Sequence, residues 1–541
     1  MSLSKTTMTK SLGLAAVLTA ILLAPACTDL TEVPQSSITP DNFYRNAQEA
    51  TGGLASVYAA LRNLNGNYYQ ASEVSTDEMI VPTRGTDWDD GGIWLDLHRQ
   101  TWGANSPAST SGQINGAWTD LFNGVARANV LINALQNSTF EGSAGILAEA
   151  RVLRALFYFG LMDLYGGVPI VCPETSNPIC SGIEIMPRAR NTRAEVFAFI
   201  ESELIGARAN LPATWSAAMN GRITQGAVDA MLASLYLNAE VFTGTVTEAG
   251  LQKGTARWQD AVNAADKVLN SPNYQLATDA TVGCSTPGCG WRSNFTADNG
   301  KSKENILVIK YLNQPGLGMT FAMATLHYNQ YSGGETPWNG FSTIGDTYAA
   351  FDAADQRRQI FLAGPQVNQV TGQPVTDRAG NPLIFTDIID DAKATEGQGV
   401  RIMKWPVDPN HLNRENGNDF TIFRLAEMYL IKAEALNELS PANGPAAVAL
   451  INTVRARVFN PPKPLALTLT QQQIRDAILR ERLFELTDEG KRRQDLIRMG
   501  KYNDPWSFKS ATSQTQKYRI LFPITQIVLG TNPLLEQNPG Y

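Results

Sequence analysis

The feature that most limits the possible folds of this sequence is a pair of helical segments that occurs twice. Residues 224–269 hold two segments with amphipathic helical periodicity, rich in small residues, and Pro272 follows the second segment. Residues 421–458 repeat the arrangement, with Pro461 and Pro462 after the second segment. Because such a unit cannot bury its apolar face alone, we expect the pairs to stack into a shared core.

Several other segments have the same periodicity and predict a mainly helical protein, in which the two pairs are typical of degenerate tetratricopeptide repeats. In AEARVLRALFYFGLMDLYGG, apolar or small residues from Leu153 to Leu164 define one buried face, and Gly166 follows as a stop signal. Thr470 and Gln473 could form a capping box for the last long helix. The expected helices lie near residues 45–62, 115–135, 192–209, 224–241, 256–269, 421–437 and 445–458.

The beginning of the chain has the organisation of a secretory signal. A basic start precedes the apolar run Leu12–Ala24, which is too short to span a bilayer. Ala26 followed directly by Cys27 predicts a lipoprotein signal, in which the thiol is acylated and residues 1–26 are removed. The alternative is an ordinary secretory signal with a chance cysteine. Two acyl chains would hold the protein stably on a membrane, so we expect residues 27–42 to act as anchor and linker.

The remaining four cysteines form two local pairs, Cys172 with Cys180 and Cys284 with Cys289. Both pairs lie in loops rich in Pro, Gly and Ser, CPETSNPIC and CSTPGC, which favours short disulfides in an oxidising compartment. A zinc site is the alternative. It would require the two pairs to converge, and neither pair has the two-residue spacing common in zinc sites.

Aromatic residues concentrate in the irregular segments 66–118, 279–345 and 363–419, which contain only short strand-like runs such as LIFTDII and VRIMKW. Loops of this length are usually functional or disordered, and their aromatic content argues against disorder. One cluster comprises Trp88, Trp94, Trp102 and Trp118, and a second comprises Trp291, Tyr328, Tyr331 and Trp338. We assign Trp118 and Trp258 to helix packing, because both lie in helical sequence.

A series of motifs in order along the chain resembles the SusD/RagB family. The matching segments include TDEMIVPTRGTDWDD, AEARVLRALFYFGLMDLYGGVP, TPWNGFSTIGDTYAAFDAADQRR, FRLAEMYLIKAEALNE, INTVRARV, ERLFELTDEGKRRQDLIRMGKY and LFPITQIVLGTNPLLEQNPGY. The resemblance covers about Asp29 to Tyr541. It implies four tetratricopeptide-like units in a superhelical platform, with an irregular, loop-rich ligand-binding part and short β-hairpins.

The resemblance also implies a role at the outer membrane. Proteins of this family are lipid-anchored, exposed on the cell surface, and deliver ligands to a SusC-like, TonB-dependent transporter. We therefore expect a single SusD-like domain, 43–541. Its platform would comprise residues 43–65, 114–270 and 420–500, its ligand-binding part residues 66–113 and 271–419, and its C-terminal extension residues 501–541.

The aromatic loops suggest the ligand. A sugar ring presents a flat C–H face that packs on an aromatic face, and its hydroxyls require polar side chains around that face. The segments TRGTDWDD and HYNQYSGGETPWNG supply such side chains beside Trp88 and Trp338, both in segments that match the ligand-facing region of the family. The expected ligand-binding residues are Trp88, Arg84, Asp87, Trp94, Tyr328, Tyr331, Trp338 and Asn339.

Three glutamates on the last long helix are the feature closest to an enzyme active site. Glu481, Glu485 and Glu489 share one helix face, and a glycosidase needs two neighbouring carboxylates. Structural pairing with arginines, Arg424 among them, is the simpler interpretation, and Asp355 with Arg357 and Arg358 is interpreted in the same way. The three histidines are scattered along the sequence, so they indicate neither a metal site nor a catalytic set. We therefore do not expect an enzyme. A scaffold that binds only a protein partner is another alternative. The tryptophans in polar loops argue against it, because such a scaffold does not require them.

Charge and composition exclude one class of ligand. The net charge is −7 without a run of Lys and Arg, which excludes a typical nucleic-acid-binding protein. The preferred ligand is an oligosaccharide or polysaccharide, and a peptide is the alternative within the same family. No cofactor is expected. Structural calcium is conceivable in the Asp- and Asn-rich loops, although none has a convincing ligand spacing.

Overall fold

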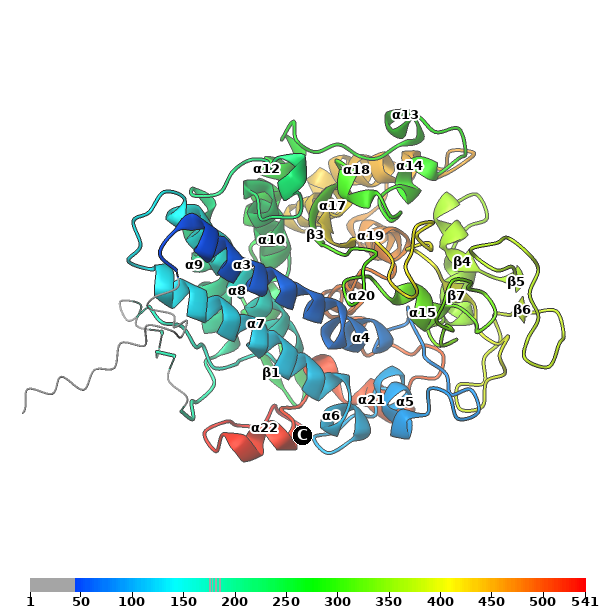
Figure 1. Ribbon diagram of the computed structural model, residues 1–541, viewed down its shortest axis with the longest axis horizontal. Coiled ribbons are helices and arrows are strands. Elements are labelled where there is room, and N and C mark those ends of the chain that lie inside the picture. Colours follow the sequence, from blue (N-terminus) through cyan, green and yellow to red (C-terminus); the bar gives the residue numbers. More distant parts are fainter. Residues whose placement is uncertain (1–43, 175–176, 178, 181, 184–185) are drawn as a thin grey trace, which may run out of the picture. The chain divides into compact units, whose positions relative to one another are not determined.

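Stacked helices form one part of the protein, as the repeated pairs predicted. The computed structural model describes residues 44–541 except 175–176, 178, 181 and 184–185, so the expected signal peptide, Cys27 and the linker 27–42 lie outside the described residues. Helices α7 and α8 pack together, as do α8 with α9, α10 with α12, α12 with α17, and α17 with α18 (Figure 1). The long helices are α3 (Ala47–Ala60), α7 (Gln113–Leu135), α8 (Ser143–Tyr165), α9 (Arg193–Arg208), α10 (Gln225–Leu237), α12 (Trp258–Leu269), α17 (Leu425–Leu439), α18 (Gly444–Ala456) and α19 (Gln471–Leu486).

The sequence signals for helix ends are realised in the structure. Helix α8 ends at Gly166, whose φ of 76° is readily adopted only by glycine. Helix α19 begins at a capping box, in which Thr470 and Gln473 each bond to the other's backbone N–H. Gly124 of α7 lies against the ring of Phe157 in α8, where a β-carbon would be 2.6 Å from the ring. The small residue therefore lets the two helices approach closely.

Shorter helices and strands surround this platform. The shorter helices are α4 (Asn67–Val74), α5 (Ile93–His98), α6 (Pro107–Thr110), α11 (Ala239–Phe242), α13 (Asp279–Val282), α14 (Cys289–Arg292), α15 (Phe321–Thr325), α16 (Gly345–Ala350), α20 (Arg492–Arg498), α21 (Ala511–Thr515) and α22 (Gln526–Thr531). Helix α4 packs against α7. Residues 67–74, assigned to the loops from the sequence, therefore belong structurally with the helices.

Four antiparallel strand pairs link distant segments. They are β1 (Thr245–Thr247) with β2 (Gly250–Gln252), β3 (Asn305–Ile309) with β8 (Phe420–Arg424), β4 (Phe361–Leu362) with β7 (Arg401–Ile402), and β5 (Gly364–Pro365) with β6 (Ile384–Phe385). The expected helix at 421–437 is corrected at its start. Its first residues, Thr421–Arg424, belong to β8, because their β-branched and aromatic side chains pair with the apolar strand β3, and α17 follows.

Buried ion pairs join the platform to the loop segments. Arg424 at the end of β8 binds Glu304, Glu485 and Glu489, with Nη1–Oε1 distances of 2.9 Å to Glu304 and 2.5 Å to Glu485. Arg357 binds Glu485 at 2.8 Å and also Asp355 at 2.7 Å. All of these side chains are buried. The prediction of structural Arg–Glu pairing on this helix is therefore confirmed.

Two disulfides each close a short loop. Cys172 is bonded to Cys180, and Cys284 is bonded to Cys289, the pairs expected from the sequence. Among the helices of the described residues, none is both long enough and apolar enough to cross a membrane.

Candidate ligand-binding site

A cleft of about 490 Å³ opens among three loop segments, the first of which is almost 300 residues from the other two in the sequence. It is lined by Arg84 and Gly85, by residues of the 377–384 segment, and by Ala394–Gly397. Arg84 and Asp87 exchange backbone hydrogen bonds of 2.9 and 3.0 Å, and Gly85 has a φ of 66° in the tight turn between them. This turn holds Arg84 at the cleft and Asp87 beside it.

A network of charged and aromatic side chains adjoins the cleft. The Tyr328 hydroxyl donates to Asp87 Oδ2 at 2.5 Å, and the Arg378 guanidinium lies 4.2 Å from the centre of the Tyr328 ring. Arg378 also donates to Glu396, with an Nε–Oε1 distance of 2.5 Å, and His327 Nε2 is 2.9 Å from Glu396 Oε2. The arrangement presents fixed donors and acceptors, of the kind that sugar hydroxyls require, around an aromatic ring.

Tryptophan rings lie next to this network. Trp88 donates its indole N–H to the carbonyl of Trp338 at 2.6 Å, and its ring is 6.5 Å from that of Trp338. Trp94 and Phe341 support the Trp88 ring at 5.3 and 5.7 Å. Trp88 and Trp338 are both partly exposed, whereas Trp94 and Phe341 are buried. Trp88 and Trp338 therefore remain candidates for contact with a ligand.

Four of the eight residues expected to bind ligand are buried, and their polar groups are bonded within the protein. Arg84 is fixed by Asn339 O at 2.8 Å, Ser342 Oγ at 3.2 Å and Thr395 O at 2.5 Å, so it ties three segments together. Asn339 accepts from Arg401 at 2.7 Å and is fully buried.

Trp94 is 6% exposed and donates to Asp90 at 2.7 Å, so its ring supports Trp88 instead of offering a free face. Tyr331 is also buried, and its hydroxyl donates to Asn413 O. These residues act through packing and hydrogen bonding, because their polar atoms already have partners within the protein.

Two further tryptophans from the sequence clusters lie in the core. Trp102 donates to the Tyr541 hydroxyl at 2.8 Å and packs against Phe522. Trp291 donates to Glu485 at 3.0 Å and is part of the buried ionic region. Both residues lie close in sequence to the candidate binding loops, but their side chains are buried in the core.

The electrostatics of the site follow from burial and local pairing. Burial lowers the pKa of Arg84 to about 10, and it raises the pKa of Tyr328 to about 12 together with the hydrogen bond to Asp87. Burial opposes ionisation of Glu396, but hydrogen bonds from the Arg378 backbone and side chain lower its pKa to about 2. Burial also lowers the pKa of His327. At neutral pH the Arg378–Glu396 pair is therefore charged.

Arg378, Glu396 and His327 were not identified from the sequence. Arg378 and Glu396 lie in turns of the segments TDRAGNP and ATEGQG, which carry no motif that marks them. His327 was noted only as a scattered histidine. His327 directly precedes Tyr328 in the sequence, but Arg378 and Glu396 reach Tyr328 and Asp87 only through tertiary contacts, so no local signal could have revealed the network.

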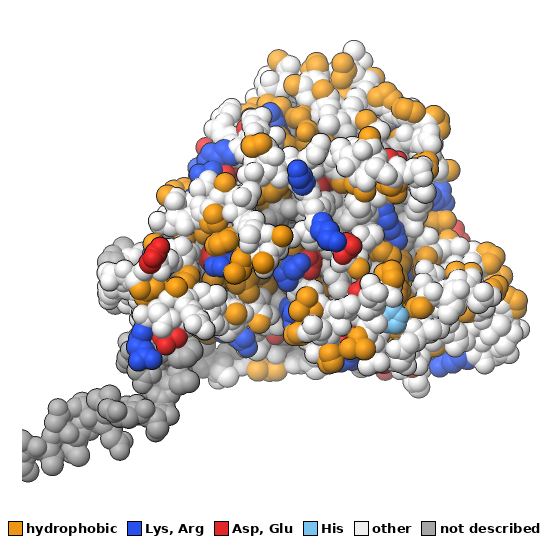
Figure 2. Space-filling model, turned by 45° about the horizontal axis from the view of Figure 1, so that its top comes forward, with side chains coloured by type: hydrophobic (Ala, Val, Ile, Leu, Met, Phe, Trp, Pro, Cys, Tyr) orange, Lys and Arg blue, Asp and Glu red, His pale blue; other side chains and the backbone are white. Residues whose placement is uncertain are grey.

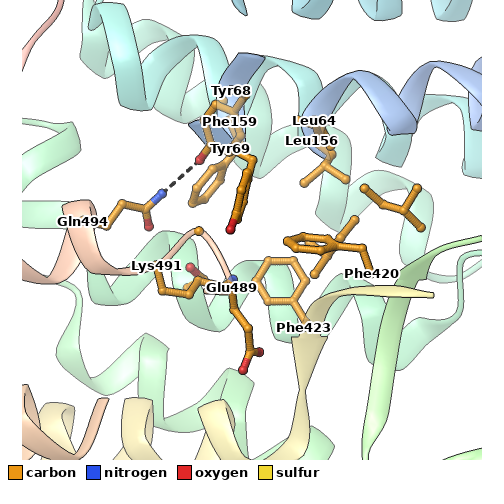
Figure 3. Close-up of a pocket in the computed structure, with 15 residues that line it drawn as sticks. Leu64, Tyr68, Tyr69, Leu156, Phe159, Phe420, Phe423, Glu489, Lys491 and Gln494 are labelled. Carbon is orange, nitrogen blue, oxygen red and sulfur yellow. Dashed lines mark hydrogen bonds between the residues drawn. The ribbon is translucent and has the colours of Figure 1, made fainter. Parts of the chain in front are cut away.

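A second cavity, of only about 60 Å³, lies among helices of the platform and strands β3 and β8 (Figure 3). Tyr68, Tyr69, Phe159, Phe420 and Phe423 face it, and Figure 3 shows Gln494 donating to the Tyr68 hydroxyl, at 3.4 Å. Its charged residues are already occupied, since Glu489 binds Arg424 and Lys491 binds Glu427. We assign this cavity to packing of the core.

The molecular surface is chemically mixed. On the face in Figure 2, positive and negative side chains are scattered among apolar and neutral ones, without a continuous charged stripe. A neutral or weakly charged ligand suits such a surface better than a polyanion does.

The fold defines a helical-repeat protein, and its loops bring aromatic and polar side chains together at a candidate binding site. The chain belongs to the SusD family: the model described as SusD family matches residues 264–541, and one described as "Starch-binding associating with outer membrane" matches residues 42–237. The expected family membership and mainly helical fold are therefore confirmed.

Related proteins support the same assignment. SusD-like protein P2 of Formosa agariphila is 24% identical over 546 residues, covering 96% of this chain and 98% of that protein. Starch-binding protein SusD of Bacteroides thetaiotaomicron is 27% identical over 479 residues, covering 77% and 76%.

Solved structures share the fold. A laminarin-binding SusD-like protein has a TM-score of 0.67 and 23% identity, covering 92% of this chain and all of that chain (100%). Surface glycan-binding protein A from Bacteroides thetaiotaomicron, in complex with laminarihexaose, has a TM-score of 0.67 and 18% identity, covering 91% and 99%.

Proposed function

We propose that this protein captures an oligosaccharide or polysaccharide at the loop-built site around Trp88, Trp338 and Tyr328. The observation that carries the proposal is the position of two partly exposed tryptophan rings beside the Tyr328–Asp87–Arg378–Glu396 network. Carbohydrate recognition needs an aromatic face with fixed donors and acceptors at its edge. The names of its relatives, which include a starch-binding and a laminarin-binding protein, support this ligand class.

The expected affinity is modest. Covering about 50 Å² of apolar surface per stacked ring contributes on the order of 1 kcal/mol. Two or three such contacts with several hydrogen bonds, set against the cost of association, correspond to dissociation constants of roughly micromolar to millimolar. Weak capture is sufficient if a transporter takes up the ligand directly from this protein.

We assign no catalytic step to the protein. Glu481, Glu485 and Glu489, the carboxylates with glycosidase-like spacing, are buried and bound by arginine. A substrate cannot reach them in this structure. The proposed role is therefore binding, and products of hydrolysis in a binding assay would contradict it.

Affinity gel electrophoresis with starch, laminarin and other polysaccharides tests the proposal. We expect retardation of the protein that begins after Cys27, without new reducing ends, and loss of that retardation in Trp88→Ala and Trp338→Ala variants. Trp258→Ala, a change in platform helix α12, is the matched control and is expected to leave retardation unchanged. Unchanged retardation in both loop variants would contradict the proposed site, and binding of peptides alone would favour the peptide-binding alternative.

We also propose that Cys27 is lipidated and that the helical platform presents the site at the cell surface, above a SusC-like, TonB-dependent transporter. The supporting observations are the signal sequence and the family membership. Metabolic labelling with a fatty acid should mark the wild type and not a Cys27→Ala variant. Co-purification of a TonB-dependent barrel from solubilised outer membranes would support the partnership, and labelling of the Cys27→Ala variant would overturn the anchor.

A further inference from the structure

A second cleft, called here the platform cleft, lies where the helical platform meets residues 273–308 and shares no residue with the site in the loops. Its volume is about 250 Å³. It is bounded by the 213–224 segment before α10, by the turn after α12, and by residues 300–308 at and before β3. Of the residues that the structure describes, no Asp or Glu lines it, although several amide, hydroxyl and aromatic side chains do.

Trp215 provides a fixed aromatic surface in this cleft. Its indole N–H donates to Ile223 O at 2.8 Å, and the Arg222 guanidinium lies 4.1 Å from the ring centre. Arg222 is itself held by Glu149, with an Nε–Oε2 distance of 3.0 Å. Trp215 is nevertheless only half-buried. Because the ring is already oriented, a ligand that packs on it loses little side-chain entropy on binding.

Tyr274 provides a second aromatic surface whose place depends on a glycine. Its hydroxyl is 3.1 Å from Thr224 Oγ1, and the ring lies directly against Gly226 in the first turn of α10. A β-carbon at position 226 would be 2.2 Å from the Tyr274 hydroxyl oxygen. Glycine costs about 1 kcal/mol relative to alanine inside a helix, so the position of Tyr274 accounts for an otherwise unfavourable residue.

Polar side chains with unused bonding capacity complete the cleft. Among the described residues, no hydrogen bond or ion pair engages the side chains of Thr214, Asn273 or Lys303, all of which line it. Thr214 and Lys303 are exposed, and Asn273 is partly exposed. The cleft thus combines oriented aromatic rings with free donors and acceptors, which is the chemistry used at the loop-built site.

We propose that this platform cleft is a second carbohydrate-contact site, at which a sugar ring packs on Trp215 while Asn273 and Lys303 bind its hydroxyls. The inference rests on the proposed function for its ligand class, but on separate residues. A long polysaccharide that reaches both sites would be retained more strongly than a short oligosaccharide, because the second contact becomes intramolecular.

Fluorine NMR of protein labelled with fluorotryptophan tests the inference. The resonances of Trp88, Trp215 and Trp338 are assigned from Trp→Phe variants and followed during titration with laminarihexaose, maltohexaose, cellohexaose, xylohexaose and mannohexaose. We expect at least one oligosaccharide to shift the Trp215 resonance, and to do so also in a Trp88→Ala/Trp338→Ala double variant. Asn273→Ala should weaken that shift, whereas Trp258→Phe should not.

The outcomes separate the two proposals. A shift of the Trp88 or Trp338 resonance without a shift of the Trp215 resonance would overturn the second site and leave the proposed function intact. A shift of the Trp215 resonance alone would support the second site and overturn the proposed site in the loops. If no tryptophan responds to any of these sugars, both proposals fail. In polysaccharide gels, Trp215→Phe should reduce retention by about two- to ten-fold without abolishing it.

Discussion

Arg357 and Glu485 form an ion pair of 2.8 Å in which neither side chain is exposed to solvent. Glu485 also accepts from Arg424 at 2.5 Å, from Arg457, and from the indole N–H of Trp291 at 3.0 Å. One carboxylate of α19 therefore holds arginines from three other segments of the chain. It connects the helical platform with the loop part that carries the proposed site.

Replacement of Glu485 should be strongly destabilising. A Glu485→Ala variant leaves buried guanidinium groups without a partner, and removal of one member of a buried pair costs about 3–5 kcal/mol. Urea denaturation would measure the loss. Glu335→Ala is the matched control, because Glu335 pairs with Arg414 at the surface, where an ion pair contributes at most about 1 kcal/mol. Equal effects of the two changes would contradict the structural role of Glu485.

Asp488 should make stability depend on pH. Burial, together with the nearby charge of Glu489, raises the pKa of Asp488 to about 7. A hydrogen bond from Tyr69 and the positive charge of Lys404 oppose this increase. The folded state then binds a proton that the unfolded state has released, so stability falls as the pH rises from about 4 to 7.

An Asp488→Asn variant isolates this effect. Asparagine tolerates the φ of 67° at this position and can still accept the hydrogen bond from Tyr69. Between pH 5 and 7, the unfolding free energy of the wild type should fall relative to the variant by about 1 kcal/mol per pH unit. Parallel curves of stability against pH would refute the assignment.

Gly340 should control the position of Trp88. A β-carbon at position 340 would lie 2.3 Å from the Trp88 ring, so Gly340→Ala must displace the indole. We expect weaker glycan binding and a loss of stability of about 1–3 kcal/mol. Gly103→Ala is the control, since a β-carbon there meets no atom within 4 Å. Wild-type affinity in the Gly340→Ala variant would show that Trp88 does not contact the ligand.

Arg378 should contribute to ligand binding without supporting the fold. Its side chain is largely exposed, although it stacks on Tyr328 and binds Glu396. Arg378→Ala should weaken glycan binding by about three- to ten-fold, as expected for loss of one hydrogen bond at a solvent-exposed position, with little change in stability. Calorimetry measures the affinity. The control is Arg475→Ala, which removes a platform ion pair with Glu438 and should leave affinity unchanged.

Local sequence signals predicted the helices well, because the periodic burial of apolar residues, glycine stops and capping boxes each act within a few residues. The predicted start of α17 was wrong, because Phe420–Arg424 are stabilised more by pairing with β3 than they would be in a helix. Of the candidate site residues, Trp88, Asp87, Tyr328 and Trp338 are accessible. The burial of Trp94, Tyr331 and Asn339 depends on neighbours that are distant in sequence.

By itself, the sequence determined the helical repeats, the local cysteine pairs and the clustering of aromatic residues in loops. Only the tertiary structure decided which of those aromatic rings remain exposed, and that Arg378 and Glu396 join Tyr328. The physical reason is the range of the interactions. Helix formation follows from contacts between near neighbours in the sequence, whereas burial and ion pairing depend on segments that the fold brings together.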